Sequence, residues 1–236
     1  MKKLIIAAAA ALAFASVANA QTNLQTFYDF GRGYVTTTLE GFYGDNWGNT
    51  FFFIDHYYAD KANQYGPVNG SYFEIERCLN FWKDSKLANL SLQVEYDGLV
   101  GGLFANSTFC FGLNYFLHSK DFKNTFNIAL LYDVMFNGEA DVPVKFSGVW
   151  GFQDLFGVSG LRFSGFIDIW GNNNNFKSTG EYTKVSVITE PQLWYNIGKC
   201  IGIDNLNIGG EVELSYNFAG YEGFKCNPCA GIKWIF

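Results

Sequence analysis

The stretch from Thr125 to Phe136 reads "TFNIALLYDVMF", and apolar and polar residues alternate along it. The even positions carry Phe126, Ile128, Leu130, Tyr132, Val134 and Phe136. The odd positions include Asn127, Ala129 and Asp133. Successive side chains of a β-strand point to opposite faces, so this pattern predicts a strand with one apolar and one polar face.

The same alternation recurs in "LSLQVEYDG" (90–98), "STFCFGLNYFL" (107–117) and "NIGGEVELSYNF" (207–218). No comparable stretch shows the 3.6-residue period of a helix. The chain is therefore predicted to be all-β. Runs of alternation between turn signals predict about twelve strands, near 23–30, 33–43, 49–59, 71–80, 89–97, 106–117, 124–136, 142–153, 161–171, 184–197, 207–218 and 225–236.

The composition favours a particular kind of β protein. The chain of 236 residues is 19% aromatic, holds 26 glycines and has a formal net charge of −6. This combination is typical of an outer-membrane β-barrel, and an even number of strands would return both termini to the periplasm. The acidic balance argues against a nucleic-acid partner, because phosphate binding needs clustered Lys and Arg.

The first twenty residues, "MKKLIIAAAAALAFASVANA", combine two lysines, a short apolar run and Ala18-Asn19-Ala20. These features predict a cleaved signal peptide over residues 1–20 and export of the chain. Residues 21–236 would then form one β-barrel in the cell outer membrane, with membrane lipid as its surroundings.

The last residues, "GIKWIF", continue the alternation to the end, with Trp234 and Phe236 on one face. A barrel must pair its last strand with its first, because an open edge in hydrocarbon leaves backbone groups unsatisfied. We expect this segment to close the barrel, and Phe236 to be presented to the outer-membrane assembly machinery.

The five cysteines (Cys78, Cys110, Cys200, Cys226 and Cys229) are odd in number and scattered, so they do not predict a disulfide framework. Cys226 and Cys229 form a C-x-x-C motif without a partner motif, and the chain has only two histidines. We therefore expect no cofactor and no metal.

Periodicity alone leaves the direction of the faces open. In a membrane barrel the apolar face meets lipid and the polar face lines the interior, whereas a soluble barrel has the reverse arrangement. The aromatic load and the predicted signal peptide favour the membrane barrel, and a soluble periplasmic ligand-binding barrel is the less favoured alternative.

The segments "YVTTTLEGFYGDNWGNTFFFIDHYYAD" (34–60) and "SYFEIERCLNFWK" (71–83) resemble the Tsx-like nucleoside-specific channels. Over nearly the whole mature chain, "GDNWGNTFFFID", "SGFIDIW", "TEPQLWYN", "GGEVELSYNFAG" and "GIKWIF" resemble an uncharacterised Tsx-like family. The resemblance implies a monomeric twelve-stranded barrel that passes small polar solutes, with nucleosides among the candidates.

Strand parity also predicts which side chains line the interior. A solute such as a nucleoside needs an aromatic face and hydrogen-bonding groups. The candidate substrate-binding residues are Glu74, Glu76, Asp55, Glu40, Arg162, Asp168 and Trp194.

No catalytic residue is predicted. The histidines, His56 and His118, have no nucleophile or carboxylate placed beside them by local spacing, and no G-x-S-x-G motif occurs. The leading hypothesis is a passive outer-membrane channel for small polar solutes. The alternative is a closed structural or adhesive barrel that transports nothing.

Overall fold

The protein is described here by a computed structural model, which covers residues 20–58, 70–100, 107–136, 140–172, 176 and 178–236. The predicted signal peptide lies outside these residues and stays a prediction. Among the residues described, no helix is both long and apolar enough to cross a membrane.

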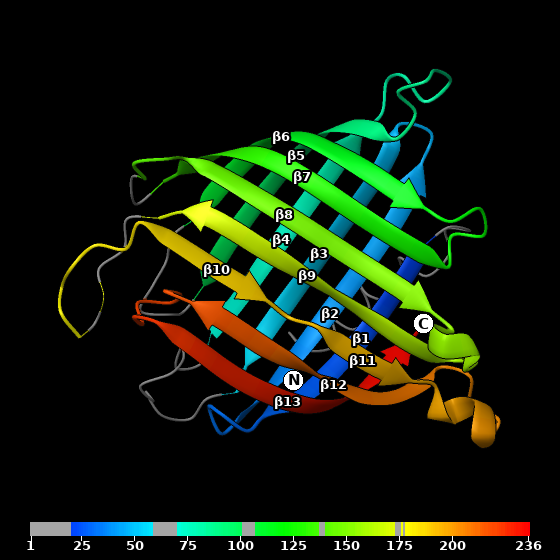
Figure 1. Ribbon diagram of the computed structural model, residues 1–236. Coiled ribbons are helices and arrows are strands. Elements are labelled where there is room, and N and C mark those ends of the chain that lie inside the picture. The colour runs from blue at the N-terminus through cyan, green and yellow to red at the C-terminus, as the bar shows by residue number, and fades with distance from the viewer. Residues whose placement is uncertain (1–19, 59–69, 101–106, 137–139, 173–175, 177) are drawn as a thin grey trace, which may run out of the picture.

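The structure is a single antiparallel sheet that closes on itself (Figure 1). Two 3-10 turns, η1 (Leu155–Gly157) and η2 (Ile197–Cys200), join strands at one end. The strands are β1 (Ala20–Asp29), β2 (Tyr34–Asp45), β3 (Gly48–Tyr57), β4 (Gly70–Leu79), β5 (Leu90–Val100), β6 (Thr108–His118), β7 (Asn124–Met135), β8 (Val144–Gln153), β9 (Leu161–Gly171), β10 (Val185–Thr189), β11 (Gln192–Tyr195), β12 (Leu206–Tyr216) and β13 (Phe224–Ile235).

The sheet has twelve strand positions, which confirms the predicted all-β, twelve-stranded barrel. Strands β10 and β11 share one position, because each pairs with β9 on one side and β12 on the other. Closure comes from β1 and β13, which pair from Asn23 with Ile235 to Asp29 with Cys229. Every backbone edge in this ring therefore has a neighbour.

One predicted strand, 184–197, differs from the structure, where it is broken at Glu190 and Pro191. Proline has no N–H to donate to a ladder, so a strand cannot run through it unchanged. The carbonyl of Pro191 still accepts from the Val212 N–H at 3.1 Å, and the Glu190 N–H donates to Phe166 O at 3.1 Å. Residues on both sides of the break keep their places in the wall.

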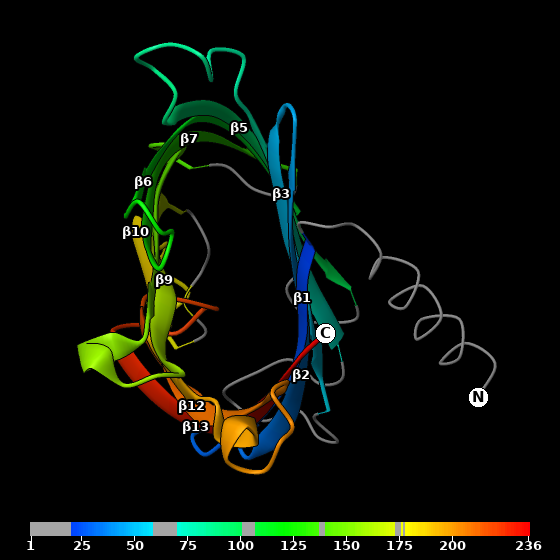
Figure 2. The same cartoon turned by 90° about the vertical axis from the view of Figure 1, so that its right-hand side faces the viewer.

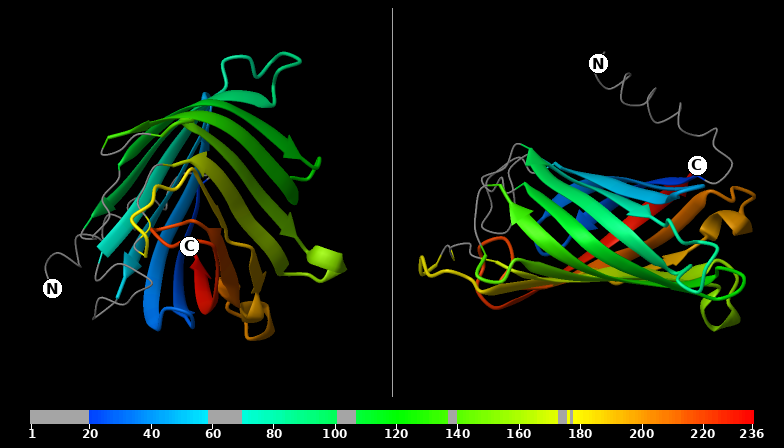
Figure 3. Two further views of the ribbon diagram at one scale, coloured as in Figure 1. Left: turned by 60° about the vertical axis from the view of Figure 1, so that its left-hand side comes forward. Right: turned by 90° about the horizontal axis from the view of Figure 1, so that it is seen from above.

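The barrel is flattened in cross-section, with β12 and β13 at one of its narrow ends (Figure 2). We call the end where β1 begins and β13 finishes the termini end. The turns η1 and η2 lie at this same end, as the right-hand view of Figure 3 shows.

Candidate functional site: the lumen

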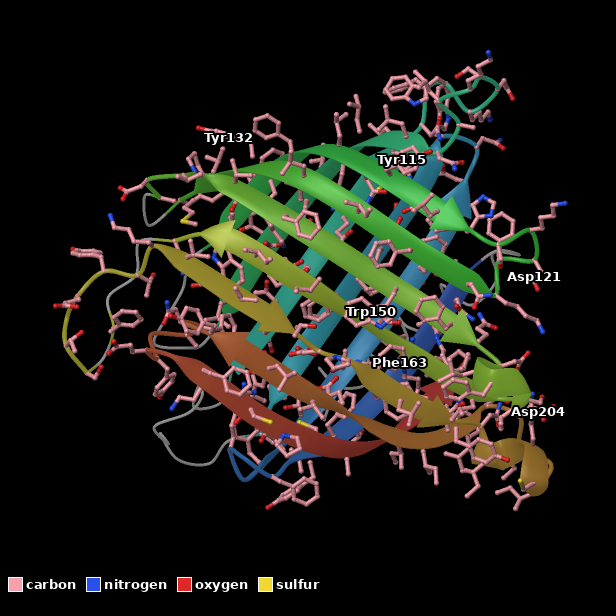
Figure 4. The ribbon with its side chains drawn as sticks, viewed as in Figure 1. Tyr115, Asp121, Tyr132, Trp150, Phe163 and Asp204 are labelled. Carbon is pink, nitrogen blue, oxygen red and sulfur yellow. The ribbon has the colours of Figure 1, made fainter. Side chains whose placement is uncertain are left out.

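The two faces of the wall have opposite polarity. Many side chains that point inward are polar and buried, as with Gln25 (0% exposed) and Glu95 (2%). Side chains that point outward are apolar and exposed, as with Phe111 (45%) and Leu130 (60%). Figure 4 shows further outward aromatic side chains: Tyr115, Tyr132, Trp150 and Phe163. A polar interior inside an apolar exterior is the arrangement of a transmembrane barrel and the inverse of a soluble one.

Part of the interior is open to solvent. Phe42 and Val149 both face inward, because their cross-strand partners Gln21, Phe51, Asn127 and Phe166 share the parity of lumen residues. Their side chains are nevertheless 43% and 37% exposed. Both lie toward the termini end of their strands, so this half of the lumen holds accessible space.

The other half of the lumen holds an acidic cluster around one lysine. The Lys145 ammonium lies 2.5 Å from Glu95 Oε1, 3.2 Å from Asp168 Oδ2 and 3.7 Å from Asp97 Oδ2. All four side chains are buried, and they come from β5, β8 and β9. We call these four residues the Lys145 cluster. Because the carboxylates are more numerous than the cation, the cluster carries a formal negative charge.

Amide side chains extend this cluster along the wall. Gln93 Nε2 donates to Glu95 Oε2 at 2.9 Å and to Glu76 Oε2 at 3.2 Å. Its Oε1 accepts from Asn114 Nδ2 at 2.8 Å. Glu74, two residues from Glu76 on β4, accepts a short hydrogen bond from Tyr72. Hydrogen bonds of this kind hold carboxylates at fixed positions in an interior of low dielectric constant.

A second group of acids lies on β2 and β3. Asp55 accepts from Thr38 Oγ1 at 2.5 Å, and Glu40 accepts from Asn23 Nδ2 at 2.9 Å and Gln25 Nε2 at 3.3 Å. These partners are neutral, and neither carboxyl group forms an ion pair with a described residue. The wall of β2 to β5 is therefore an acidic surface.

Basic and aromatic groups gather on the narrow side of the flattened cross-section where β12 and β13 lie (Figure 2). The Trp194 ring lies 5.5 Å from the ring of Phe27, and the Lys233 ammonium lies 4.3 Å from the Trp194 ring centroid. Gly209 and Gly231 lie beneath these rings: a Cβ on Gly209 would come within 2.9 Å of Trp194, and one on Gly231 within 2.7 Å of Phe27. The glycines thus make room for two aromatic rings where the wall bends at β12 and β13 (Figure 2).

Arg162 is the cross-strand neighbour of Trp194 on the same face. Its Nε atom is buried and has no hydrogen-bond partner. Arg162 is the second residue of β9, and both Trp194 and Lys233 lie near the ends of their strands, so all three belong to the termini end.

The opposite end of the lumen has a charged contact of its own. Arg32, between β1 and β2, forms an ion pair with Asp29 at 3.2 Å and a very short one with Glu213 of β12. This residue brings the connection between the first two strands against the interior of the wall.

All seven predicted site residues face the lumen, but they do not form one site. Glu74, Glu76 and Asp168 belong to the region of the Lys145 cluster. Asp55 and Glu40 lie on the neighbouring acidic wall. Arg162 and Trp194 are cross-strand neighbours at the termini end. Whether any of them contacts a solute stays a prediction.

Two lysines matter more than their sequence context indicates. Lys145 and Lys233 have the parity of lumen residues, but Lys145 stands in no motif and Lys233 stands in "GIKWIF", which indicates barrel closure and no binding site. Lys145 reaches Glu95 three strands away, and Lys233 reaches Trp194 two strands away. Contacts of this kind depend on the register of the whole barrel, which a local pattern does not give.

Glu95, Asp97 and Cys110 each bring a potential ligand atom within 4.8 Å of the others. The Lys145 ammonium already contacts both carboxylates, so a cationic group of the chain itself occupies this place. All five cysteines are free. Cys226 and Cys229 lie on β13 with opposite parity, Cys226 on the exposed outer face and Cys229 on the inner face with Glu211 and Asp29.

A comparison with protein families finds one that matches residues 20–236, described as a domain of unknown function (DUF5020). The chain belongs to the DUF5020 family. No curated protein matches it.

The solved structure of the NanC porin resembles this DUF5020 chain with a TM-score of 0.56 and 12% sequence identity, over 90% of this chain and 98% of NanC. The KdgM porin, solved with disordered oligogalacturonate, gives a TM-score of 0.49 and 11% identity over 92% and 99% of the two chains. At this identity the likeness to NanC establishes the fold, a porin-like barrel.

Proposed function

We propose that this DUF5020 barrel is an outer-membrane channel through which small polar solutes diffuse passively. The observation that supports the proposal is the pair of inverted faces, with a charged lumen that is open to solvent around Phe42 and Val149. An enclosed polar passage through an apolar wall gives a hydrophilic solute a route across lipid. Excess carboxylates in the lumen favour neutral or cationic solutes over anions.

Nucleosides are one candidate class of permeant, and they rest on the resemblance to Tsx-like channels. The lumen offers aromatic rings beside hydrogen-bonding groups, as nucleoside binding requires. The same proposal includes a monomeric barrel and recognition of Phe236 by the assembly machinery. Phe236 is exposed, and its N–H donates to Thr22 O at 2.9 Å, where β13 meets β1.

The test is single-channel conductance of the refolded protein in planar bilayers, with and without nucleosides. We expect a small conductance that leans toward cations, and block by nucleosides would support the finer assignment. Substitution of Glu74, Glu76 and Trp194 would then locate the contact. A conductance that nucleosides leave unchanged would remove them from the proposal and leave the channel.

A closed structural barrel is the second candidate, and the packing of the Lys145 cluster favours it. Glu95, Asp168 and Lys145 are buried and bridge strands on one side of the lumen, while Arg32 bridges the wall at the same half. If these groups fill the passage completely, the refolded protein will insert into bilayers and remain silent. Such silence would overturn the channel proposal.

A further inference from the structure

Arg162 and Lys233 are cationic groups of the lumen that no carboxylate of the described residues contacts directly. Within the described part of the chain neither forms an ion pair, and Arg162 Nε is buried without an acceptor. Lys233 is buried, and its ammonium contacts the Trp194 ring instead of a carboxylate. Burying a charge without a counter-charge is costly, so this arrangement calls for an anionic partner.

The two cations are close enough to interact with each other. Arg162 and Trp194 are cross-strand neighbours, Lys233 lies over the same indole, and the positive charges of Arg162 and Lys233 repel. An anionic group placed between them would relieve the repulsion and supply the missing acceptors. We call Arg162 and Lys233 the basic station.

The lumen does contain carboxylates, but none that the structure describes forms an ion pair with the basic station. Asp168 lies on the same strand as Arg162, six residues further on, which is about 20 Å along a strand. Asp168 contacts Lys145, whereas Arg162 and Lys233 lie toward the termini end. Glu40 and Glu211 act on Lys233 electrostatically, but neither forms an ion pair with it. The Lys145 cluster and the two bases are therefore separated along the axis of the lumen.

This separation favours one class of solute over the alternatives. A simple anion must pass the net-negative Lys145 cluster, and a simple cation has no partner at the basic station. A solute that carries an ammonium and a carboxylate but no net charge finds an opposite charge at both places. Arginine is suited to the carboxylate, because its planar fork can donate two parallel hydrogen bonds.

We propose that Arg162 and Lys233 form a carboxylate-binding station, and that the preferred solutes are small zwitterions. The inference rests on the proposed channel function and names its substrate class. A zwitterion would contact the Lys145 cluster and the basic station in succession, since the two lie too far apart for one small molecule to span.

The experiment compares three solutes of similar size in proteoliposome swelling: 4-aminobutyrate (a zwitterion), n-butylammonium (a cation) and butyramide (neutral). The variant is Arg162→Gln/Lys233→Met, which keeps most of each side chain and removes both charges. The control is Arg77→Gln, because Arg77 pairs with Asp45 on the outer face and does not reach the lumen.

We expect wild-type protein to pass 4-aminobutyrate at least as fast as butyramide. The double variant should slow 4-aminobutyrate several-fold and leave butyramide unchanged, while Arg77→Gln changes neither. If the swelling rates of the three solutes stand in the same ratio for the wild type and the double variant, the proposal of a carboxylate-binding station is wrong.

A barrel that passes none of the solutes would refute the channel, and the station is then tested by binding. Calorimetric titration of the detergent-solubilised protein with 4-aminobutyrate should show about tenfold weaker binding for the double variant, the loss expected for one charge-assisted contact. Identical binding, or no binding to the wild type, would overturn the station on its own.

Discussion

At the scale of single residues, Lys145 holds the acidic half of the lumen together. Its ammonium contacts Glu95, Asp97 and Asp168, which are buried and come from two other strands. Without it, these three carboxylates would have no ion pair with any residue that the structure describes. A buried ion pair contributes little net free energy to folding, because the desolvation of both charges offsets their attraction. Removal of one partner is nevertheless strongly destabilising, because the other charge is left buried and unpaired.

We therefore expect Lys145→Met to destabilise the barrel by about 3–5 kcal/mol, the cost of breaking a buried ion pair. The measurement is the urea midpoint for unfolding from lipid vesicles. The matched control is Lys184→Met, because Lys184 is exposed and its one ion pair within the described residues is with the exposed Asp141. That change should cost less than about 1 kcal/mol. Equal midpoints for the two variants would show that Lys145 is dispensable.

At the scale of elements, the bend at β12 and β13 depends on residues without side chains. A Cβ on Gly209 would lie 2.0 Å from Leu193 O as well as against the Trp194 ring. The backbone cannot yield as a flexible side chain would, so neighbouring strands would have to separate. The glycines of "NIGGEVE" and "CAGIKW" are thus part of the geometry that closes the barrel.

Gly209→Ala should accordingly destabilise the barrel by about 1–3 kcal/mol, as overpacking typically does. Gly44→Ala is the control, because a Cβ at Gly44 meets nothing within 4 Å. Folded and unfolded fractions can be read from the mobility of unheated samples in detergent gels. A Gly209→Ala protein as resistant to unfolding as Gly44→Ala would contradict the packing argument.

At the scale of the whole molecule, the lumen is an acidic passage with a basic section at the termini end. The described carboxylates include Glu40, Asp55, Glu74, Glu76, Glu95, Asp97, Asp133, Asp168, Glu190, Glu211 and Glu213, and far fewer cations face them. The Glu190 carboxylate interacts electrostatically with Asp55 and Glu74 of the opposite wall. A flattened cross-section brings these two walls close, so the whole field acts on a passing ion.

The reversal potential in a potassium chloride gradient should therefore show preference for potassium over chloride. Glu74→Gln/Glu76→Gln should reduce this preference, because it removes two acidic groups from the lumen wall. Glu181→Gln, an exposed change between β9 and β10, should leave it unchanged. Preference for chloride in the wild type would contradict the acidic passage.

The sequence was sufficient for the strands and for the two faces of each strand, because alternation is a local property. The local pattern could not give the direction of the faces. The same alternation of Leu130 and Asp133 would occur in a soluble barrel, where the apolar face points inward and the polar face points outward. The local pattern also could not give the contacts between strands that are not neighbours. Lys145 meets Glu95 and Lys233 meets Trp194 only after the register and curvature of the whole sheet have brought their strands together. Pro191 was visible in the sequence, and its effect on the tenth strand position was not predicted.

The free thiols of this wall supply a chemical probe that needs no engineering. Cys229 faces the interior, Cys226 faces outward three residues away, and Cys200 is exposed in η2. A charged thiosulfonate in water would modify Cys200 in any state of the protein, but Cys229 only if the reagent can enter the barrel. A maleimide dissolved in the lipid would instead report on Cys226. Modification of Cys229 in the native protein would thus show that the interior admits a molecule of known size.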